Sequence, residues 1–191
     1  MSQVFAVVGS RGLPASFAPL VARVCRALVA RSHRFPCGAS LAVGCASGAD
    51  SFAVAAVPAS AIRVFAVAPC LASASPRLRG PLSRPGLAVV WGAGGGSSVP
   101  PRATLARRTR AVVAAASAGC VAFLSSPDSP GSLLACRAAA DRGLRVVVFP
   151  CGFVGSALPL LAAGGSWSPC SSGGVWVGAW VWSPAPDLFG D

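Results

Sequence analysis

Short apolar runs alternate along this chain with longer stretches in which apolar residues recur every three or four positions. The short runs lie at residues 3–8, 40–43, 62–67, 120–124 and 144–149. The helical stretches lie at residues 14–31, 50–57, 103–116 and 132–142. In the first helical stretch, Leu20, Val24 and Leu28 form an apolar stripe opposite Arg23 and Arg26. Strands that alternate with helices of this length predict βαβ crossovers and a mostly parallel sheet.

Some of the strand runs, such as residues 146–149, are apolar at every position, which indicates that helices cover both faces of the sheet. The expected fold class is therefore α/β, a Rossmann-like, mostly parallel sheet flanked by helices over residues 1–150. Residues 69–102 are rich in Pro, Gly and Ser, and they predict a long loop with one further strand at residues 87–91.

The C-terminal segment, residues 151–191, has a different composition and predicts an irregular extension rich in Trp and Gly. Residues 175–177 and 179–182 flank Gly178, as an extended segment or a hairpin would. The extension packs either on its own domain, as a lid, or on a neighbouring subunit. The second interpretation predicts a homo-oligomer, and a filament if the contact is head-to-tail. The residues expected at such a self-association surface are Trp167, Trp176, Trp180 and Trp182.

Two glycine-rich turns follow the first two strand runs. The first contains Gly9, Ser10 and Arg11, and the second extends from Gly44 to Asp50. A glycine turn between a strand and a helix directs backbone N–H groups and a helix N-terminus at an anion. Two such turns in succession predict a nucleotide- or phosphate-binding crevice at the carboxyl ends of parallel strands.

Each candidate residue also has a purely structural interpretation. The glycines could form tight turns alone, Asp50 could cap its helix, the arginines of the third helix could form a solvated face, and Ser132 could be an N-cap. The candidate ligand-binding residues are Gly9, Ser10, Arg11, Gly44, Ser47, Gly48, Asp50, Arg108, Arg110, Gly131 and Ser132.

The charge of the chain is strongly positive. Its 191 residues include 16 Arg, no Lys, 5 Asp and no Glu, which gives a formal net charge of +11. The missing residue types mostly share adenine-rich codons, so a bias of the genome is one explanation. The alternative is a polyanionic partner, because guanidinium groups bind phosphates bidentately and stack on bases. Nucleic acid is therefore a possible partner on charge alone.

Several classes of site are not expected. None of the 8 Cys forms a Cys-x-x-Cys pair and His33 is the only histidine, so the spacing of a zinc site is missing. No Ser-His-Asp or Cys-His arrangement predicts catalytic residues. Mean hydropathy is +0.67, but prolines interrupt the uncharged segment after Arg145, so no membrane partner is expected. The N-terminus lacks a secretion signal, which predicts a cytoplasmic protein with reduced thiols.

Four segments resemble the SLOG superfamily, the Rossmann-like domains related to Smf/DprA and to the LOG phosphoribohydrolases. They are Val8 to Arg11, Gly44 to Asp50, Arg108 to Arg110, and Gly131-Ser132 followed by residues 145–149. The resemblance is closest to the small YspA-like members. It implies a nucleotide-derived ligand held by the candidate residues. Relation to DprA implies DNA or RNA binding as an alternative, and SLOG proteins commonly form dimers or larger assemblies.

One departure from the family bears on activity. LOG enzymes carry Pro-Gly-Gly-x-Gly-Thr-x-x-Glu, whose glutamate takes part in cleaving the base from the ribose phosphate. The matching stretch here, residues 127–135, ends in Ala135, and only Asp50 and Asp128 could substitute. The resemblance therefore implies a nucleotide- or phosphate-binding, sensor-like domain without LOG-type phosphoribohydrolase activity. The alternatives are a DprA-like nucleic-acid binder and a self-assembling structural protein.

Overall fold

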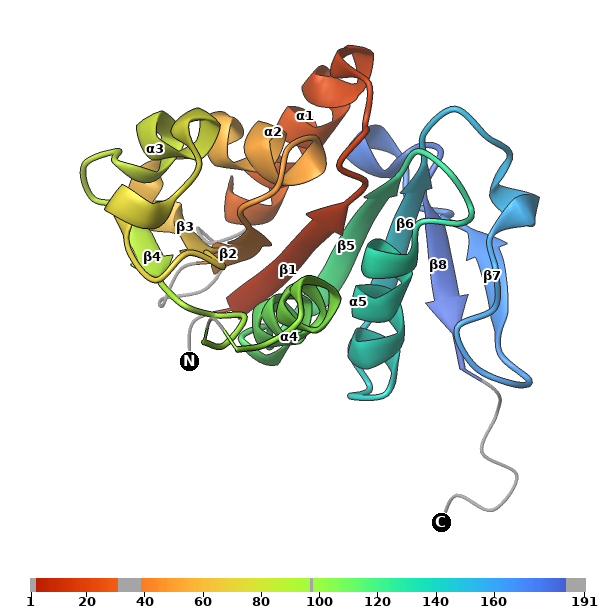
Figure 1. The fold of residues 1–191 in the computed structure, drawn as a ribbon. Helices are drawn as coiled ribbons and strands as arrows, with labels where there is room; N and C mark the ends of the chain where they lie inside the picture. Colours follow the sequence, from red (N-terminus) through yellow and green to blue (C-terminus); the bar gives the residue numbers. More distant parts are fainter. Residues whose placement is uncertain (1–2, 31–38, 97, 185–191) are drawn as a thin grey trace.

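The computed structural model describes residues 3–30, 39–96 and 98–184, so His33 lies outside the described residues. The chain forms an α/β fold with an eight-stranded, mostly parallel sheet (Figure 1). Six strands run parallel in the order β4-β3-β2-β1-β5-β6, and β8 and β7 follow at the far edge. Their bounds are β1 Gln3–Gly9, β2 Ala39–Gly44, β3 Ile62–Phe65, β4 Ala88–Val90, β5 Gly119–Leu124, β6 Val146–Pro150, β7 Ser166–Pro169 and β8 Trp180–Ser183.

Helices cover both faces of the sheet, as the fully apolar strands predict. Successive residues of a strand point to opposite faces. Val7 therefore packs in one core with α1 (Ala18–Ala30) and α2 (Ala49–Ala56). Ala6 and Val8 pack in the other core, with α4 (Pro101–Ala114) and α5 (Pro130–Ala140). The Rossmann-like fold class is confirmed.

The prediction of a long loop at residues 69–102 is wrong in part. This segment contains a helix, α3, at Pro76–Leu82, as well as the expected strand, which is β4. The prolines of this segment favoured a loop, but Pro76 occupies the first turn of α3. Proline is tolerated there, because an N–H at that position would have no intrahelical acceptor. Leu82 is buried in the core that α1 and α2 share, so α3 covers the β4 edge of that face.

The C-terminal extension continues the same sheet. β8 pairs antiparallel with β6, and β7 pairs antiparallel with β8. The prediction of an extended segment at residues 175–177 is wrong, because Gly174–Trp176 form a 3-10 helix. The hairpin instead consists of β7 and β8. Among the described residues, no helix has the length and apolar character needed to cross a bilayer.

The tail tryptophans pack largely within their own chain. Trp182 is buried, and its ring meets that of Trp167 edge-on at 5.2 Å between centroids. Trp176 stacks on Phe149 at 6.2 Å. Trp180 lies directly against the backbone of a neighbouring loop, where a Cβ on Gly155 would come within 1.9 Å of its indole nitrogen. These contacts agree with the lid interpretation of the extension.

Candidate functional site

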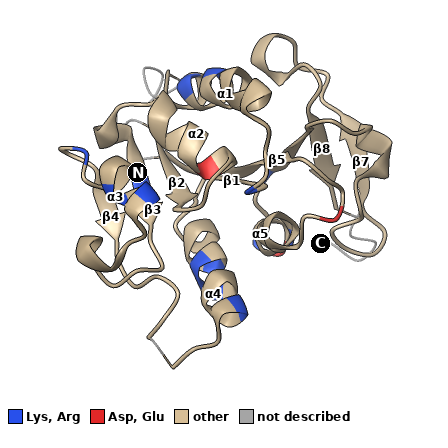
Figure 2. Ribbon diagram, turned by 45° about the horizontal axis from the view of Figure 1, so that its top comes forward, with Lys and Arg blue, Asp and Glu red and all other residues tan. Residues whose placement is uncertain are grey.

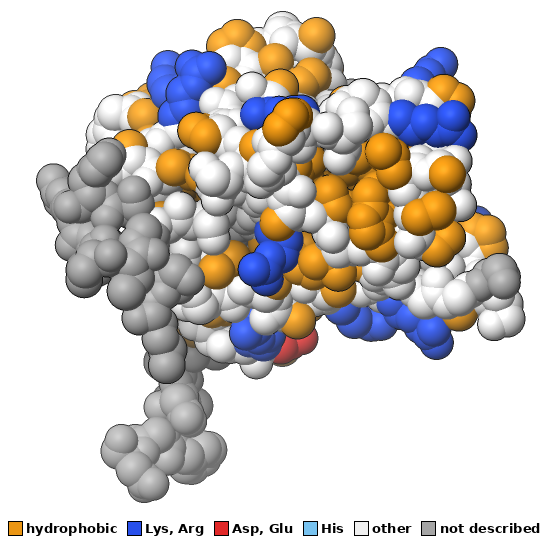
Figure 3. Space-filling model, turned by 90° about the vertical axis from the view of Figure 1, so that its left-hand side faces the viewer, with side chains coloured by type: hydrophobic (Ala, Val, Ile, Leu, Met, Phe, Trp, Pro, Cys, Tyr) orange, Lys and Arg blue, Asp and Glu red, His pale blue; other side chains and the backbone are white. Residues whose placement is uncertain are grey.

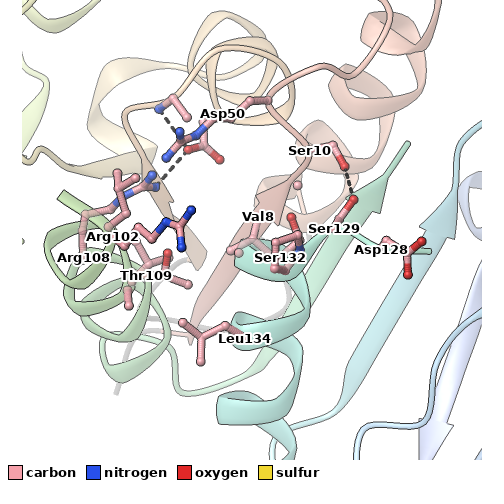
Figure 4. A pocket seen from close by; sticks show the side chains of 18 residues that line it. Val8, Ser10, Asp50, Arg102, Arg108, Thr109, Asp128, Ser129, Ser132 and Leu134 are labelled. Atoms are coloured by element: carbon pink, nitrogen blue, oxygen red, sulfur yellow. Dashed lines mark hydrogen bonds and ion pairs between the residues drawn. The ribbon is translucent and has the colours of Figure 1, made fainter. Parts of the chain in front are cut away.

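A pocket of about 840 Å³ opens at the carboxyl ends of β1 and β5, between α4 and the start of α5 (Figure 4). The strand order reverses here, because β1 has β2 on one side and β5 on the other. In open α/β sheets, such a reversal leaves a crevice outside the strand ends, and ligands bind there. The fold therefore puts the pocket where the two glycine turns predict one.

Most of the predicted ligand-binding residues line this pocket, but not all of them. Those that do are Gly9, Ser10, Arg11, Asp50, Arg108, Gly131 and Ser132. Gly44, Ser47, Gly48 and Arg110 are not among the lining residues. The first three lie behind the pocket wall. Arg110 is exposed on α4.

The second glycine turn supports the first. Gly48 has a φ of +71°, and a Cβ there would lie 2.3 Å from the carbonyl oxygen of Ser10. The N–H of Ala49 donates to that same oxygen at 3.4 Å, and the Ser47 hydroxyl donates to the carbonyl of Arg11 at 3.2 Å. Ser47 and Gly48 therefore hold the turn after β1 in place from behind.

Gly44 makes room for a buried ion pair. The Arg108 Nη1 donates to Asp50 Oδ2 at 3.1 Å, and both side chains are more than nine-tenths buried. A Cβ on Gly44 would lie 1.4 Å from that Nη1. The N–H of Ala46 also donates to Asp50 Oδ2, at 3.1 Å. Asp50 thus joins the second turn to α4, and its predicted role as a cap of α2 is wrong because no side chain caps that helix.

The electrostatics of this pair are dominated by burial. Burial raises the pKa of Asp50 above its ordinary value, although the Arg108 charge and the Ala46 N–H act in the opposite direction. The buried Nε of Arg108 finds no acceptor among the described residues. A buried donor without an acceptor is costly, so Arg108 has unused hydrogen-bonding capacity at the pocket wall.

Ser10 ties the turn after β1 to the loop that precedes α5. The N–H of Ser125 donates to Ser10 Oγ at 2.9 Å, and Ser10 Oγ lies 2.8 Å from Ser129 Oγ. Ser129 donates its own proton to the carbonyl of Ser126 at 2.9 Å. The Ser10 hydroxyl must therefore donate to Ser129, so in this structure its proton is engaged within the protein.

The first turn of α5 presents free donors to the pocket. The first intrahelical bond runs from the N–H of Leu133 to the carbonyl of Ser129, at 2.9 Å. Within the described chain, the N–H groups of Gly131 and Ser132 meet no acceptor. Ser132 lies inside the helix, so the alternative that it is the N-cap is wrong. A helix N-terminus with unpaired N–H groups attracts an anion.

Sequence analysis missed several lining residues on α4. Arg102, Leu105, Thr109 and Val112 recur at helical spacing on the face that meets the pocket. That periodicity is visible in the sequence, but the sequence analysis singles out only the arginines of this helix. Leu134 on α5 and Val8 on β1 complete an apolar wall, with Ser129 and Asp128 near the mouth.

The residues present define what this site can do. No group of His, Cys, Asp or Glu among the described residues could hold a metal ion. Ala135, which the resemblance to LOG enzymes would place at the glutamate position, is buried in the core on the inner face of α5 and does not line the pocket. No protein-family model matches this chain, and the search of curated proteins finds no match.

Proposed function

We propose that this protein binds a nucleotide-like ligand in the pocket between α4 and α5, as a SLOG-type sensor domain. The observation that carries the proposal is convergence on one pocket: the turn after β1, the free N–H groups of α5 and the buried Arg108 all meet there. Its volume of about 840 Å³ lies within the range of small-molecule sites.

The two parts of the pocket suit the two parts of a nucleotide. Leu105, Val112 and Leu134 offer an apolar wall on which a base can pack. The N–H groups of Gly131 and Ser132 offer hydrogen bonds to phosphate oxygens at the positive end of a helix. Binding rather than hydrolysis is proposed, because Ala135 stands at the position that matches the LOG glutamate, Asp50 is paired with Arg108, and Asp128, the other acid of the pocket, is exposed.

Calorimetry with adenosine mono-, di- and triphosphate tests the proposal. Arg11 is exposed at the pocket, so Arg11→Ala should weaken nucleotide binding by ~1.5–3 kcal/mol through loss of a charge-assisted contact. Arg77→Ala is the matched control, because Arg77 is exposed on α3 and does not line the pocket. A wild-type protein with no affinity for any of these nucleotides contradicts the proposal.

Binding to nucleic acid is a second candidate, and the exposed arginines favour it. Most described arginines are exposed, and arginines lie on α1, α3 and α4 (Figure 2). The face in Figure 3 carries arginine side chains at several separate places and little acidic surface. If these arginines bind phosphates, affinity for a DNA or RNA oligonucleotide falls steeply with salt, and substituting Arg107 and Arg110 together flattens that slope.

A further inference from the structure

The buried pair of Asp50 and Arg108 lies at the wall of the pocket, and only part of its bonding capacity is used. Arg108 reaches Asp50 through Nη1, and its Nε finds no acceptor in the described chain. A guanidinium can offer two parallel donors to one oxyanion, and the Nε edge of Arg108 keeps a buried donor that no described residue satisfies. Figure 4 shows the Arg108 side chain extending from α4 toward Asp50, across the pocket from Ser132.

We propose that Asp50 competes with an anionic ligand for hydrogen bonds from Arg108. When the ligand binds, it replaces part of the interaction between Arg108 and Asp50. This inference rests on the proposed function, since it concerns the same pocket. In this structure Asp50 holds Arg108 in place and neutralises part of its charge. When a phosphate group enters beside the first turn of α5, Arg108 turns partly from Asp50 toward it and donates from the Nε edge, which has no acceptor among the described residues.

The geometry prepares Arg108 to bind an anionic ligand, whereas Asp50 limits that binding. Arg108 is already buried, so a ligand that bonds to its Nε does not have to strip water from it. Asp50 shares the pocket lining with the ligand, and a negative charge there opposes an arriving anion. The other charged groups of the lining are Arg11, Arg102 and Asp128. Asp50 is the only one of the lining acids that is paired with an arginine among the described residues.

The role of Asp50 predicts a change of affinity in an unusual direction. Asp50→Asn keeps an oxygen that accepts from Ala46 and Arg108 but removes the negative charge. Adenosine monophosphate should then bind about threefold to tenfold more tightly at about pH 8. Arg108→Lys keeps the positive charge and loses the second parallel donor, so it should weaken the same binding about tenfold.

A double-mutant cycle separates competition for Arg108 from a general effect of charge. If Asp50 competes for the arginine, the gain from Asp50→Asn disappears when Arg108 is replaced by Lys. Asp128→Asn is the matched control, because Asp128 lines the same pocket without an arginine partner in the described chain, and its gain should be smaller. Adenosine, which has no phosphate, should bind all variants equally well.

The outcomes distinguish this inference from the function on which it rests. If adenosine monophosphate binds the wild type and Asp50→Asn does not tighten binding, the inference is wrong and the proposed function stands. The same conclusion holds if the gain persists with Lys at position 108. If neither protein binds the nucleotide, both proposals fail. Thermal unfolding followed by circular dichroism checks that each variant folds, and Asp50→Ser replaces Asp50→Asn in the cycle if the latter does not.

Discussion

At the scale of single residues, the space at Gly44 decides whether the Asp50–Arg108 ion pair at the pocket wall can form. The Arg108 guanidinium occupies the position that a Cβ on residue 44 would take, and Asp50 Oδ2 lies 2.4 Å from it. Neither atom belongs to an exposed, freely moving side chain, because both residues are buried. The glycine is therefore needed for the ion pair, and not for contact with a ligand.

Gly44→Ala should lower the free energy of unfolding by about 3 kcal/mol or more, because it breaks a buried ion pair and leaves its charges unpaired. Urea unfolding followed by circular dichroism measures this loss. Gly80→Ala is the matched control: a Cβ there meets nothing within 4 Å and Gly80 lies in α3, so this change should leave stability unaltered or slightly raised. Equal stability of the two variants would contradict the role given to Gly44.

At the scale of elements, the pocket depends on a connection between two loops that are far apart in sequence. Ser10 follows β1, while Ser125 and Ser129 lie between β5 and α5. These hydrogen bonds fix the start of α5 relative to the turn after β1. The backbone N–H groups of Gly131 and Ser132 are therefore held toward the pocket by the hydrogen bonds of the Ser10 hydroxyl.

Ser10→Ala should lower the free energy of unfolding by about 0.5–1.5 kcal/mol, because the half-buried Ser125 N–H and Ser129 hydroxyl lose a partner. It should also raise amide hydrogen exchange at the N-terminus of α5. Ser83→Ala is the control, since its hydroxyl makes one exposed bond, to Gly80 at the end of α3. If exchange at the start of α5 rises equally in both variants, the connection does not hold the helix in place.

The sequence was enough to predict the parallel core and the position of the pocket, but not most of the contacts between the residues that line the pocket. Apolar runs and helical periodicity are local properties of the chain, so they predicted β1 to β6 and the large helices. The Asp50–Arg108 pair joins residues 58 positions apart, and no local pattern indicates it. The tail misled in another way: residues 175–177 have the composition of a strand, but Gly174 and Gly178 adopt positive φ on either side and turn the chain.

At the scale of the whole molecule, the tail is part of the fold. β8 pairs with β6, and Trp176 covers Phe149, which is itself almost fully buried. Self-association remains a prediction, and the large apolar side chains that stay well exposed among the described residues include Val154, Leu160 and Val177. An interface built on the tail would therefore use these aliphatic residues more than the tryptophans.

Deleting residues 165–191 should abolish cooperative folding instead of releasing a smaller, stable species. The deletion removes β7 and β8 and uncovers one edge of β6 together with Phe149. Losing a single buried Trp costs about 3–5 kcal/mol, and a domain of this kind has a total stability of only about 5–15 kcal/mol. Thermal unfolding by circular dichroism should show a broad transition or none, and light scattering should show aggregates.

A point substitution separates this structural role from an interface. Val177 is 66% exposed, so Val177→Ser should leave the melting temperature nearly unchanged. If the exposed residues of the tail form an interface, the same substitution lowers the native mass of the full-length protein at micromolar concentration. A truncated chain that melts cooperatively at the wild-type temperature, while only its native mass falls, would instead establish the tail as an assembly surface that the fold does not need.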